Sequence, residues 1–157
     1  MSSPKISVII VNYNGKKLLE NCLESLFKTD YNNFEVILVD NNSTDGSMEF
    51  VTKNYPKIIV IKLDSNKGFA EPNNIGAKIA KGEYLLFLNN DTVTTTNFIS
   101  EMIKVLEKDE KIAICQSLLL KPDGNIDSSG DFIDKMGIVY NSKTKTDEIR
   151  EISSARG

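Results

Sequence analysis

Three polar clusters, each directly after an apolar run, hold the side chains of this sequence that are best suited to binding chemistry. They are the segments 12–15 ("NYNG"), 40–46 ("DNNSTDG") and 89–92 ("NNDT"). The third is the most unusual, because the apolar residues 85–88 lead into it with no glycine or proline to turn the chain. A segment at the mouth of a site, rather than one crossing the protein surface, needs no such turn. We therefore interpret "NNDT" as part of a ligand site.

The residue types in "NNDT" are suited to a metal ion and a sugar. Mg2+ and Mn2+ prefer oxygen ligands, and Mg2+ often takes one or two carboxylates together with substrate phosphates and water. Asp91 can supply one such carboxylate, and Asn90 beside it can bond a ribose hydroxyl. The alternative is that Asn90, Asp91 and Thr92 only cap the next helix. These residues by themselves do not decide between the two interpretations.

Histidine is absent from the whole sequence. Its absence excludes the commonest general base, nucleophile systems that pair Ser or Cys with His, and imidazole metal sites. Cys22 and Cys115 both lie within apolar patterns, so we expect two buried thiols rather than a disulfide or a metal pair. The chemistry must therefore use carboxylates, amides, hydroxyls, lysines or a metal ion held by oxygen.

Length and composition indicate a single soluble domain. The 157 residues are 40% hydrophobic and 26% charged, and the net charge of -3 gives no electrostatic case for binding nucleic acid. The sequence contains no run of eighteen apolar residues, and the apolar run near its N-terminus is too short for the core of a signal peptide. We therefore expect a cytoplasmic protein.

The hydrophobic pattern predicts strands that alternate with helices. β-Branched and aliphatic runs predict buried strands, whereas apolar residues at helical spacing predict helices. The predicted strands are 6–11, 35–39, 58–61 and 84–88, with a further strand around 112–120, and the predicted helices are 18–27, 46–54, 72–81 and 98–106.

This order predicts an α/β fold with a mainly parallel sheet and helices on both faces. In such sheets, ligands bind outside the carboxyl ends of the strands, where all three polar clusters lie. The segment 64–76, "DSNKGFAEPNNIG", follows the third strand and brings further amides, a lysine and a flexible backbone to the same edge. We expect residues 5–121 to form the binding domain and residues 122–157 an irregular, β-rich extension whose last fifteen residues are mobile.

Other nucleotide-binding and phosphate-transfer patterns are absent. The turn after the first strand, "NYNGKK", has one glycine instead of the G-x-G-x-x-G of dinucleotide-binding folds, and no G-x-x-x-x-G-K-[ST] loop exists. Asn89 stands where an aspartate phosphatase needs its nucleophilic aspartate. These observations argue against a NAD enzyme, a P-loop protein and a phosphatase.

Taken together, the ordered motifs "ISVIIVNYNG", "VILVDNNSTDGS" and "NKGFAEPNNIGAKIAKGEYLLFLNNDT" closely resemble the family 2 glycosyltransferases with the GT-A fold. The resemblance covers residues 5–140, and "NYNG", "GFA" and "FLNNDT" are most similar to rhamnosyltransferase-type members. It implies a Rossmann-like nucleotide-diphospho-sugar transferase that moves a sugar from a UDP- or dTDP-sugar to a glycan or lipid-linked acceptor in polysaccharide biosynthesis. An acceptor of that kind implies peripheral association with the inner face of the membrane.

The resemblance also implies which residues bind the base of the donor. Val11 and Tyr13 would line the base pocket, with the Tyr13 ring against the pyrimidine. Asp40 would accept a hydrogen bond from the base N3–H, which favours uracil or thymine over cytosine. Asn42 and Asp45 would shape that loop.

The same resemblance implies the residues at the diphosphate and the sugar. Asp91 would be the ligand of Mg2+ or Mn2+, and Asn90 would face the ribose. Gly68 would allow close approach of the backbone, while Lys67 and Asn74 would contact phosphate or sugar. The family's D-x-D motif corresponds here to "NND", which leaves one carboxylate, so metal binding should depend heavily on the diphosphate.

The predicted reaction is direct displacement with inversion, which needs a carboxylate base for the acceptor hydroxyl. In the family this base follows the part of the chain present here, so we expect a chain truncated after its nucleotide-binding part. We expect Asp127, Asp131 and Asp134 to be surface carboxylates. The alternative function is a catalytically silent module that binds a nucleotide or a partner and lacks the general base.

Overall fold

The computed structural model describes residues 3–133 and 139–141. The chain divides into two compact units, Met1–Thr96 and Asn97–Gly157. All the residues predicted to bind the donor or the metal lie in the first unit. The predicted boundary after residue 121 separates parts of the chain by their role in binding and not by packing. The two compact units therefore do not test it, and it stays a prediction.

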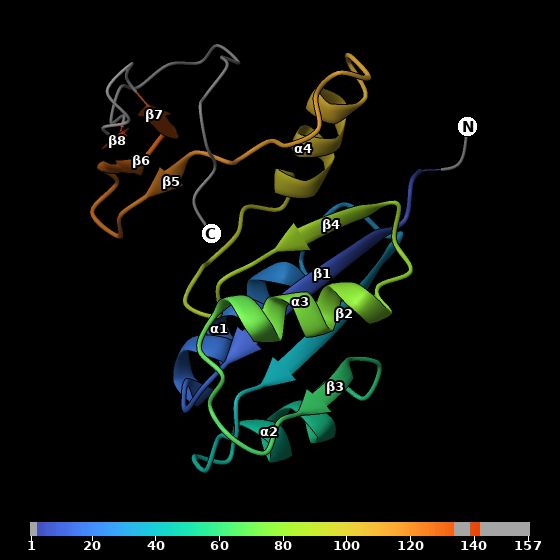
Figure 1. Cartoon of the computed structure of the whole chain (residues 1–157), viewed down its shortest axis with the longest axis vertical. Helices are drawn as coiled ribbons and strands as arrows, with labels where there is room; N and C mark the ends of the chain where they lie inside the picture. Colours follow the sequence, from blue (N-terminus) through green and yellow to red (C-terminus); the bar gives the residue numbers. More distant parts are fainter. Residues whose placement is uncertain (1–2, 134–138, 142–157) are drawn as a thin grey trace. The chain divides into compact units, whose positions relative to one another are not determined.

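A parallel sheet of four strands in the order β3-β2-β1-β4 forms the centre of the first unit (Figure 1). Each pair of neighbouring strands runs parallel, and β1 aligns with β2 from Ile6 opposite Phe34 to Asn12 opposite Asp40. The carboxyl ends of β1 and β2 therefore meet at one edge of the sheet. The strands are β1 (Ile6–Asn12), β2 (Phe34–Asp40), β3 (Ile59–Lys62) and β4 (Tyr84–Phe87).

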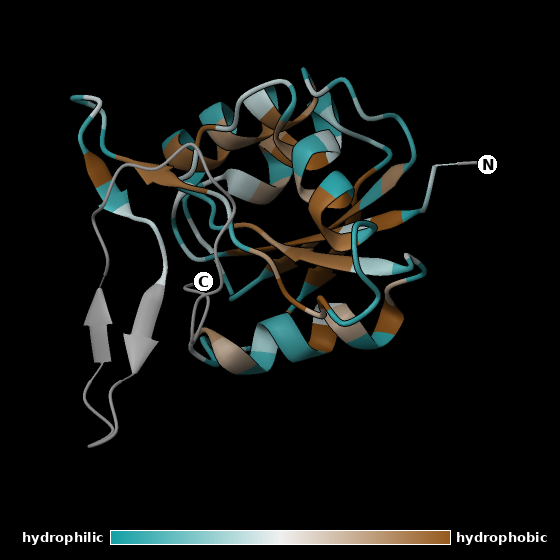
Figure 2. Ribbon diagram, turned by 90° about the horizontal axis from the view of Figure 1, so that it is seen from above, coloured by the Kyte–Doolittle hydropathy of each residue, from teal (hydrophilic) through white to brown (hydrophobic). Residues whose placement is uncertain are grey.

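Helices cover both faces of this sheet, as predicted. The helix α3 (Ala70–Ile79) lies in front of β1 and β2 in Figure 1, whereas α1 (Lys16–Leu26) lies behind β1 and α2 (Ser47–Asn54) lies behind β3. Hydrophobic residues are concentrated on the strands between these layers (Figure 2). On the α3 side, the buried residues Ile9, Ile37 and Val39 pack with half-buried residues of β3, of α3 and of the segments that follow them.

Several predicted elements differ from the structure at their ends. The helix α3 begins at Ala70 and ends at Ile79, two residues earlier at both ends than predicted, with Pro72 still in its first turn. The predicted strand at 112–120 is wrong, since residues 112–118 have no regular secondary structure and β5 comprises Leu119–Leu120 alone. Both cysteines are free, as predicted, but Cys115 is half-buried rather than buried.

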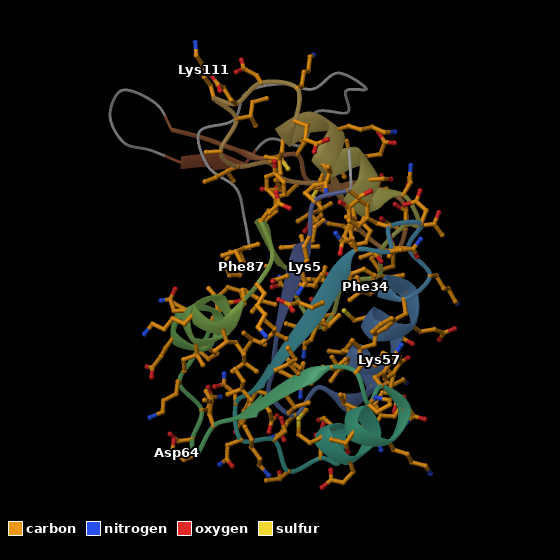
Figure 3. All side chains as sticks on the ribbon, turned by 90° about the vertical axis from the view of Figure 1, so that its right-hand side faces the viewer. Lys5, Phe34, Lys57, Asp64, Phe87 and Lys111 are labelled. Carbon is orange, nitrogen blue, oxygen red and sulfur yellow. The ribbon has the colours of Figure 1, made fainter. Side chains whose placement is uncertain are left out.

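The apolar run 85–88 is less buried than predicted. Leu85 and Phe87 are exposed by 45% and 46%, while Leu88 is buried. The reason is that β4 is an edge strand of the four-stranded sheet, and α3 contacts β1 and β2 on that face. Phe87 accordingly lies at the margin of the sheet (Figure 3).

The described residues of the second unit form one helix and two small antiparallel sheets. The helix α4 (Phe98–Leu106) has the predicted bounds, and it is followed by β5 paired with β6 (Ile126–Ser128) and by β7 (Asp131–Ile133) paired with β8 (Val139–Asn141). Asp127 is exposed, as predicted. Asp134 and the last fifteen residues, predicted to be mobile, lie outside the described residues, as does the side chain of Asp131. Within the described part of the chain, no helix is both long enough and apolar enough to cross a membrane.

Candidate functional site

The carboxyl ends of β1 and β2 bring two polar residues side by side in the interior. Asn12 and Asp40 are partners in the strand register, and both are completely buried. The backbone N–H of Asn41 donates to the carbonyl of Asn12 over 2.8 Å, which extends the pairing of the two strands by one residue. Because buried polar side chains require hydrogen-bond partners, the loops beyond these strands must supply them.

The carboxylate of Asp40 is satisfied by the loop that follows it. The backbone N–H of Ser43 lies 3.1 Å and 3.3 Å from the two carboxylate oxygens. Asn42 permits this turn, because it adopts a left-handed backbone conformation with φ of 68° that asparagine tolerates better than most residues. A carboxylate has acceptor sites left over after one N–H. Since Asp40 is fully buried, a group from outside could reach these sites only if neighbouring atoms moved.

The side-chain amide of Asn12 joins the ends of three strands. Its Nδ2 donates to Oγ of Ser43, 3.1 Å away, in the loop after β2. Its Oδ1 accepts a hydrogen bond of 2.8 Å from Nδ2 of Asn90, which follows β4. The backbone N–H of Asn14 also donates to Oγ of Ser43, over 3.0 Å. The three polar clusters of the sequence therefore meet at one place, as predicted.

Asp45 lies at the beginning of two helices. Its carboxylate accepts a hydrogen bond of 2.8 Å from the backbone N–H of Lys16, the first residue of α1, and one of 3.1 Å from that of Ser47, the first residue of α2. Burial opposes the charge, but the hydrogen bonds from the Ser47 hydroxyl and these N–H groups outweigh it and lower the pKa of Asp45. A carboxylate at two helix N-termini is also favoured by both helix dipoles. Asp45 therefore fixes the shape of the 40–46 loop.

Asn41 connects this loop to the segment after β3. The side chain is 2% exposed, and its Nδ2 donates to the carbonyl of Gly68 over 2.7 Å while its Oδ1 accepts from the backbone N–H of Lys67 over 3.1 Å. Gly68 has a φ of 76°, which glycine adopts without strain. The Lys67 ammonium lies 3.6 Å from Asp64. The predicted binding residues Lys67 and Gly68 are thus tied to the end of β2.

The remaining predicted binding residues differ in exposure. Tyr13 is 51% exposed just beyond β1, so its side chain is partly accessible to a ligand. Val11 is half-buried on β1, opposite Val39. Asn74 is exposed on α3. The structure places Tyr13 and Val11 at the edge that carries Asn12, while the side chain of Asn74 makes no hydrogen bond to a described residue.

Asp91 is the exposed carboxylate of the third cluster. It accepts no hydrogen bond within the described part of the chain. Behind it, the Cys22 thiol donates to the carbonyl of Asn89 over 3.6 Å. Burial, and then the negative charge of Asp91, raise the pKa of the Cys22 thiol to about 12, so this thiol stays protonated at neutral pH. Asp91 is therefore an exposed carboxyl of this cluster that no described residue engages.

A family model decides the classification. The model described as "Glycosyl transferase family 2" matches residues 7–152, which include all three clusters. The chain belongs to glycosyl transferase family 2.

Two curated relatives are glycosyltransferases. GlyG of Streptococcus pneumoniae serotype 4 is 36% identical over 117 residues, which are 71% of this chain and 38% of GlyG. The Escherichia coli protein WfaP, named as a UDP-Glc:alpha-D-GlcNAc-diphosphoundecaprenol beta-1,3-glucosyltransferase, is 37% identical over 106 residues, which are 67% of this chain and 42% of WfaP. This family 2 chain therefore spans less than half the length of these relatives.

Solved structures share the fold. TarS 1-349 of S. aureus, in complex with UDP-GlcNAc, has a TM-score of 0.62 and 28% identity over 74% of this chain and 38% of its own. A mannosyltransferase from Pyrobaculum calidifontis, PcManGT, has a TM-score of 0.65 and 24% identity over 78% of this chain and 37% of its own. At that lower identity the likeness to PcManGT supports only the shared fold, which is the predicted GT-A fold.

The side-chain oxygens of the third cluster fit a cation that a substrate diphosphate would hold for the most part. Among the described residues, no group of three or more His, Cys, Asp and Glu side chains could hold a metal ion by itself. Asp91 offers one exposed carboxylate, and Oδ1 of Asn90 accepts no hydrogen bond from a described residue. Mg2+ commonly binds through one or two carboxylates, substrate phosphates and water, which matches this set of oxygens.

Sequence reasoning did not assign roles to three residues that connect the site: Asn12, Asn41 and Ser43. Asn12 had a visible signal, because it ends a run of buried strand residues and so has to be satisfied in the interior. Asn41 and Ser43 had no such signal. Asn41 has the same residue type as the exposed Asn42, and Ser43 is one of several small polar residues in its loop.

Proposed function

We propose that this chain is the donor-binding part of a glycosyltransferase that uses a UDP-sugar. The observation that carries the proposal is the hydrogen-bonded junction of Asn90, Asn12 and Ser43, which gathers the three polar loops at the carboxyl edge of the sheet. Ligands bind at that edge in open parallel α/β sheets. Family membership and the names of WfaP and TarS, which mention UDP-glucose and UDP-GlcNAc, favour UDP over dTDP.

In this proposal the first two loops bind the uridine. The exposed ring of Tyr13 stacks on uracil, and Val11 lines the pocket beside it. The carboxylate of Asp40 accepts a hydrogen bond from uracil N3–H after the loop around Ser43 has shifted to admit the base. Asn42 and Asp45 hold the conformation of this loop, the first through its left-handed backbone and the second through the two helix N-termini.

The third cluster and the 64–69 segment would hold the diphosphate and its cation. Asp91 would hold Mg2+ or Mn2+ together with the phosphate oxygens, and the bound cation would supply Lewis-acid stabilisation to the leaving diphosphate. Asn90 faces the ribose. Lys67 contributes positive charge and Gly68 an accessible backbone near the diphosphate, while Asn74 contacts the sugar or a phosphate from α3.

The transfer itself is proposed to proceed with inversion at the sugar. A carboxylate general base has to act on the acceptor hydroxyl from the side opposite the diphosphate, and we assign this role to no described residue. The name of WfaP includes a diphosphoundecaprenol-linked sugar, which favours a lipid-linked glycan as acceptor. Such an acceptor would place the protein in the cytoplasm at the inner face of the membrane, in polysaccharide biosynthesis.

Calorimetric titration tests the proposal. The chain is titrated with UDP, dTDP and GDP, each with and without Mn2+. We expect binding that requires Mn2+ and is tightest for UDP. Equal binding of GDP would contradict base reading by Asp40, and binding of UDP that does not change with Mn2+ would contradict the role of Asp91. Failure to bind any of the three would overturn the proposed donor site in this chain.

A turnover assay on a protein as long as the relatives distinguishes a transferase from the alternative, a silent module that only binds nucleotide. The assay measures release of UDP from a UDP-sugar. A chain of that length that binds UDP with Mn2+ but releases no UDP from UDP-glucose or UDP-GlcNAc in the presence of a lipid-linked acceptor would favour the silent module. Release of UDP that depends on the acceptor would favour the transferase.

A further inference from the structure

The side-chain amide of Asn12 is held in one place from several sides. Asn12 ends β1, is completely buried, and accepts the backbone hydrogen bond of Asn41 at its own carbonyl. Both polar atoms of its amide are also used, Nδ2 by Ser43 and Oδ1 by Asn90. An amide that is buried and paired at both ends has little freedom to rotate. Asn12 is therefore a fixed point against which Asn90 is oriented.

The hydrogen bond to Asn12 determines which atom Asn90 presents to a ligand. Asn90 uses Nδ2 to donate to Asn12, so its Oδ1 is on the other side of the amide. Asn90 is half-buried, and no described residue donates to that oxygen. An amide oxygen is an acceptor for a hydroxyl and a ligand for a hard cation, whereas an NH2 group is neither.

Gly15 leaves room for this hydrogen bond. A Cβ atom added to Gly15 would lie 2.5 Å from Nδ2 of Asn90 and 2.9 Å from Oδ1 of Asn12. The φ of Gly15 is -116°, which other residues adopt readily, so the backbone conformation does not explain a glycine here. The close approach of the Asn12 and Asn90 amides does.

We propose that Asn12 is a positioning residue that holds the amide of Asn90 with Oδ1 turned toward the nucleotide-sugar. This inference rests on the proposed donor site and extends it to a residue that touches neither donor nor metal. Through Ser43, the same amide connects the loop after β4 to the loop that closes over Asp40. Asn12 thereby couples the base-reading loop to the metal-binding cluster.

The first experiment observes the Asn90 amide directly by 15N NMR. The side-chain NH2 signals of Asn90 are identified by their loss in Asn90→Ala. In the original chain we expect one proton of the pair to be shifted downfield and slow to exchange with solvent. In Asn12→Ala its chemical shift and exchange rate should become those of a solvent-exposed amide. In Asn12→Asp the shift should remain, because the carboxylate still accepts from Asn90. Asn90 signals in Asn12→Ala that match the original chain would overturn the proposal, whether or not UDP binds.

The second experiment is a double-mutant cycle on UDP binding in the presence of Mn2+. Losing a positioned hydrogen bond should weaken binding by about 3- to 10-fold in Asn12→Ala. In the Asn90→Ala background the same change should cost less than about 2-fold, since the group that Asn12 positions is gone. Asn12→Asp keeps an acceptor for Asn90 but loses the donor to Ser43 and adds a charge beside Asp40, so it should recover only part of the affinity. Asn54→Ala, which removes an exposed amide near the end of α2, is the control and should leave affinity unchanged.

A failure of the positioning role can be distinguished from a failure of the proposed donor site. Losses of affinity that simply add in the cycle would mean that Asn12 acts by general stability and not through Asn90. An original chain that binds no UDP with Mn2+, but whose Asn90 signals respond to Asn12 as expected, would contradict the proposed donor site and leave the orientation of Asn90 by Asn12 supported.

Discussion

Gly15 and Asn90 approach so closely that a Cβ atom on Gly15 would lie 2.5 Å from Nδ2 of Asn90. A side chain at position 15 would therefore displace the amide that follows β4. The contact joins Gly15, the residue before α1, to the cluster after β4 that is predicted to bind the metal. These two segments lie far apart in the sequence.

We expect Gly15→Ala to weaken binding of UDP with Mn2+ by about 3- to 10-fold, because Asn90 must leave its hydrogen bond with Asn12. The buried Oδ1 of Asn12 would lose its partner and would lie only 2.9 Å from the added Cβ, so the midpoint of thermal unfolding should fall as well. Calorimetry and a thermal melt of the same sample measure both quantities. Loss of stability with unchanged affinity would show that the site tolerates the displacement.

Asp91→Asn should abolish the dependence of UDP binding on Mn2+. The change removes the exposed carboxylate and leaves amides as the protein's ligands in this cluster, and these bind a hard cation more weakly. The measurement is a UDP titration at several Mn2+ concentrations. Asp109→Asn, an exposed aspartate in the turn after α4, is the matched control and should behave like the original chain. Affinity in Asp91→Asn that still rises with Mn2+ would disprove the assignment.

Gly76→Ala should lower the free energy of unfolding by about 1–3 kcal/mol, the usual cost of overpacking a core. A Cβ atom there would lie 2.7 Å from Cγ2 of Ile9 and 3.3 Å from Cγ2 of Val39, both on buried strands. Helix propensity would favour alanine by up to about 1 kcal/mol, so a net loss in urea unfolding would show that the contact with the sheet outweighs it. Asn74→Ala, on an exposed position of α3, should be close to neutral or stabilising.

The architecture was predictable because the buried strands are short, continuous apolar runs between helices with a clear periodicity. The helix α4 is an example, since Phe98, Ile99, Met102 and Ile103 repeat at helical spacing and the observed bounds equal the predicted ones. The segment 112–118 shows the limit of this reasoning. Its apolar residues resemble a strand, but Ile114 is 74% exposed and the segment pairs with no described strand.

The candidate site was predictable as a place but not as a set of contacts. The rule for parallel sheets put all three clusters at one edge, because it depends on strand order alone. Which amide faces inward depends on local turns instead. Asn41 and Asn42 are neighbours of the same type, yet Asn41 is buried between two loops and Asn42 is exposed with a left-handed backbone. The full burial of Asp40 likewise follows from how the loop returns to Ser43, which no sequence pattern revealed.

Glu35 should cause the free energy of unfolding to decrease as the pH falls into the acidic range. Its Oε1 accepts hydrogen bonds of 2.7 Å from the Ser7 hydroxyl and from the backbone N–H of Lys81, and its Oε2 one of 2.7 Å from the Lys5 ammonium. Burial would raise the pKa of this carboxyl, but these hydrogen bonds and the charge of Lys5 outweigh it and lower the pKa from 4.5 to about 2. The depressed value means that the folded state favours the ionised form.

The stabilisation from Glu35 is therefore complete above about pH 4.5 and is lost as the pH falls through about 2. The shift corresponds to at most about 3 kcal/mol, and solvent around the partly exposed Lys5 reduces this to on the order of 1–2 kcal/mol. Urea unfolding between about pH 5 and about pH 3 should show a steeper loss of stability for the original chain than for Glu35→Gln. Glu110→Gln, at an exposed position, should retain the original slope, and an equal slope in all three proteins would contradict the role of Glu35.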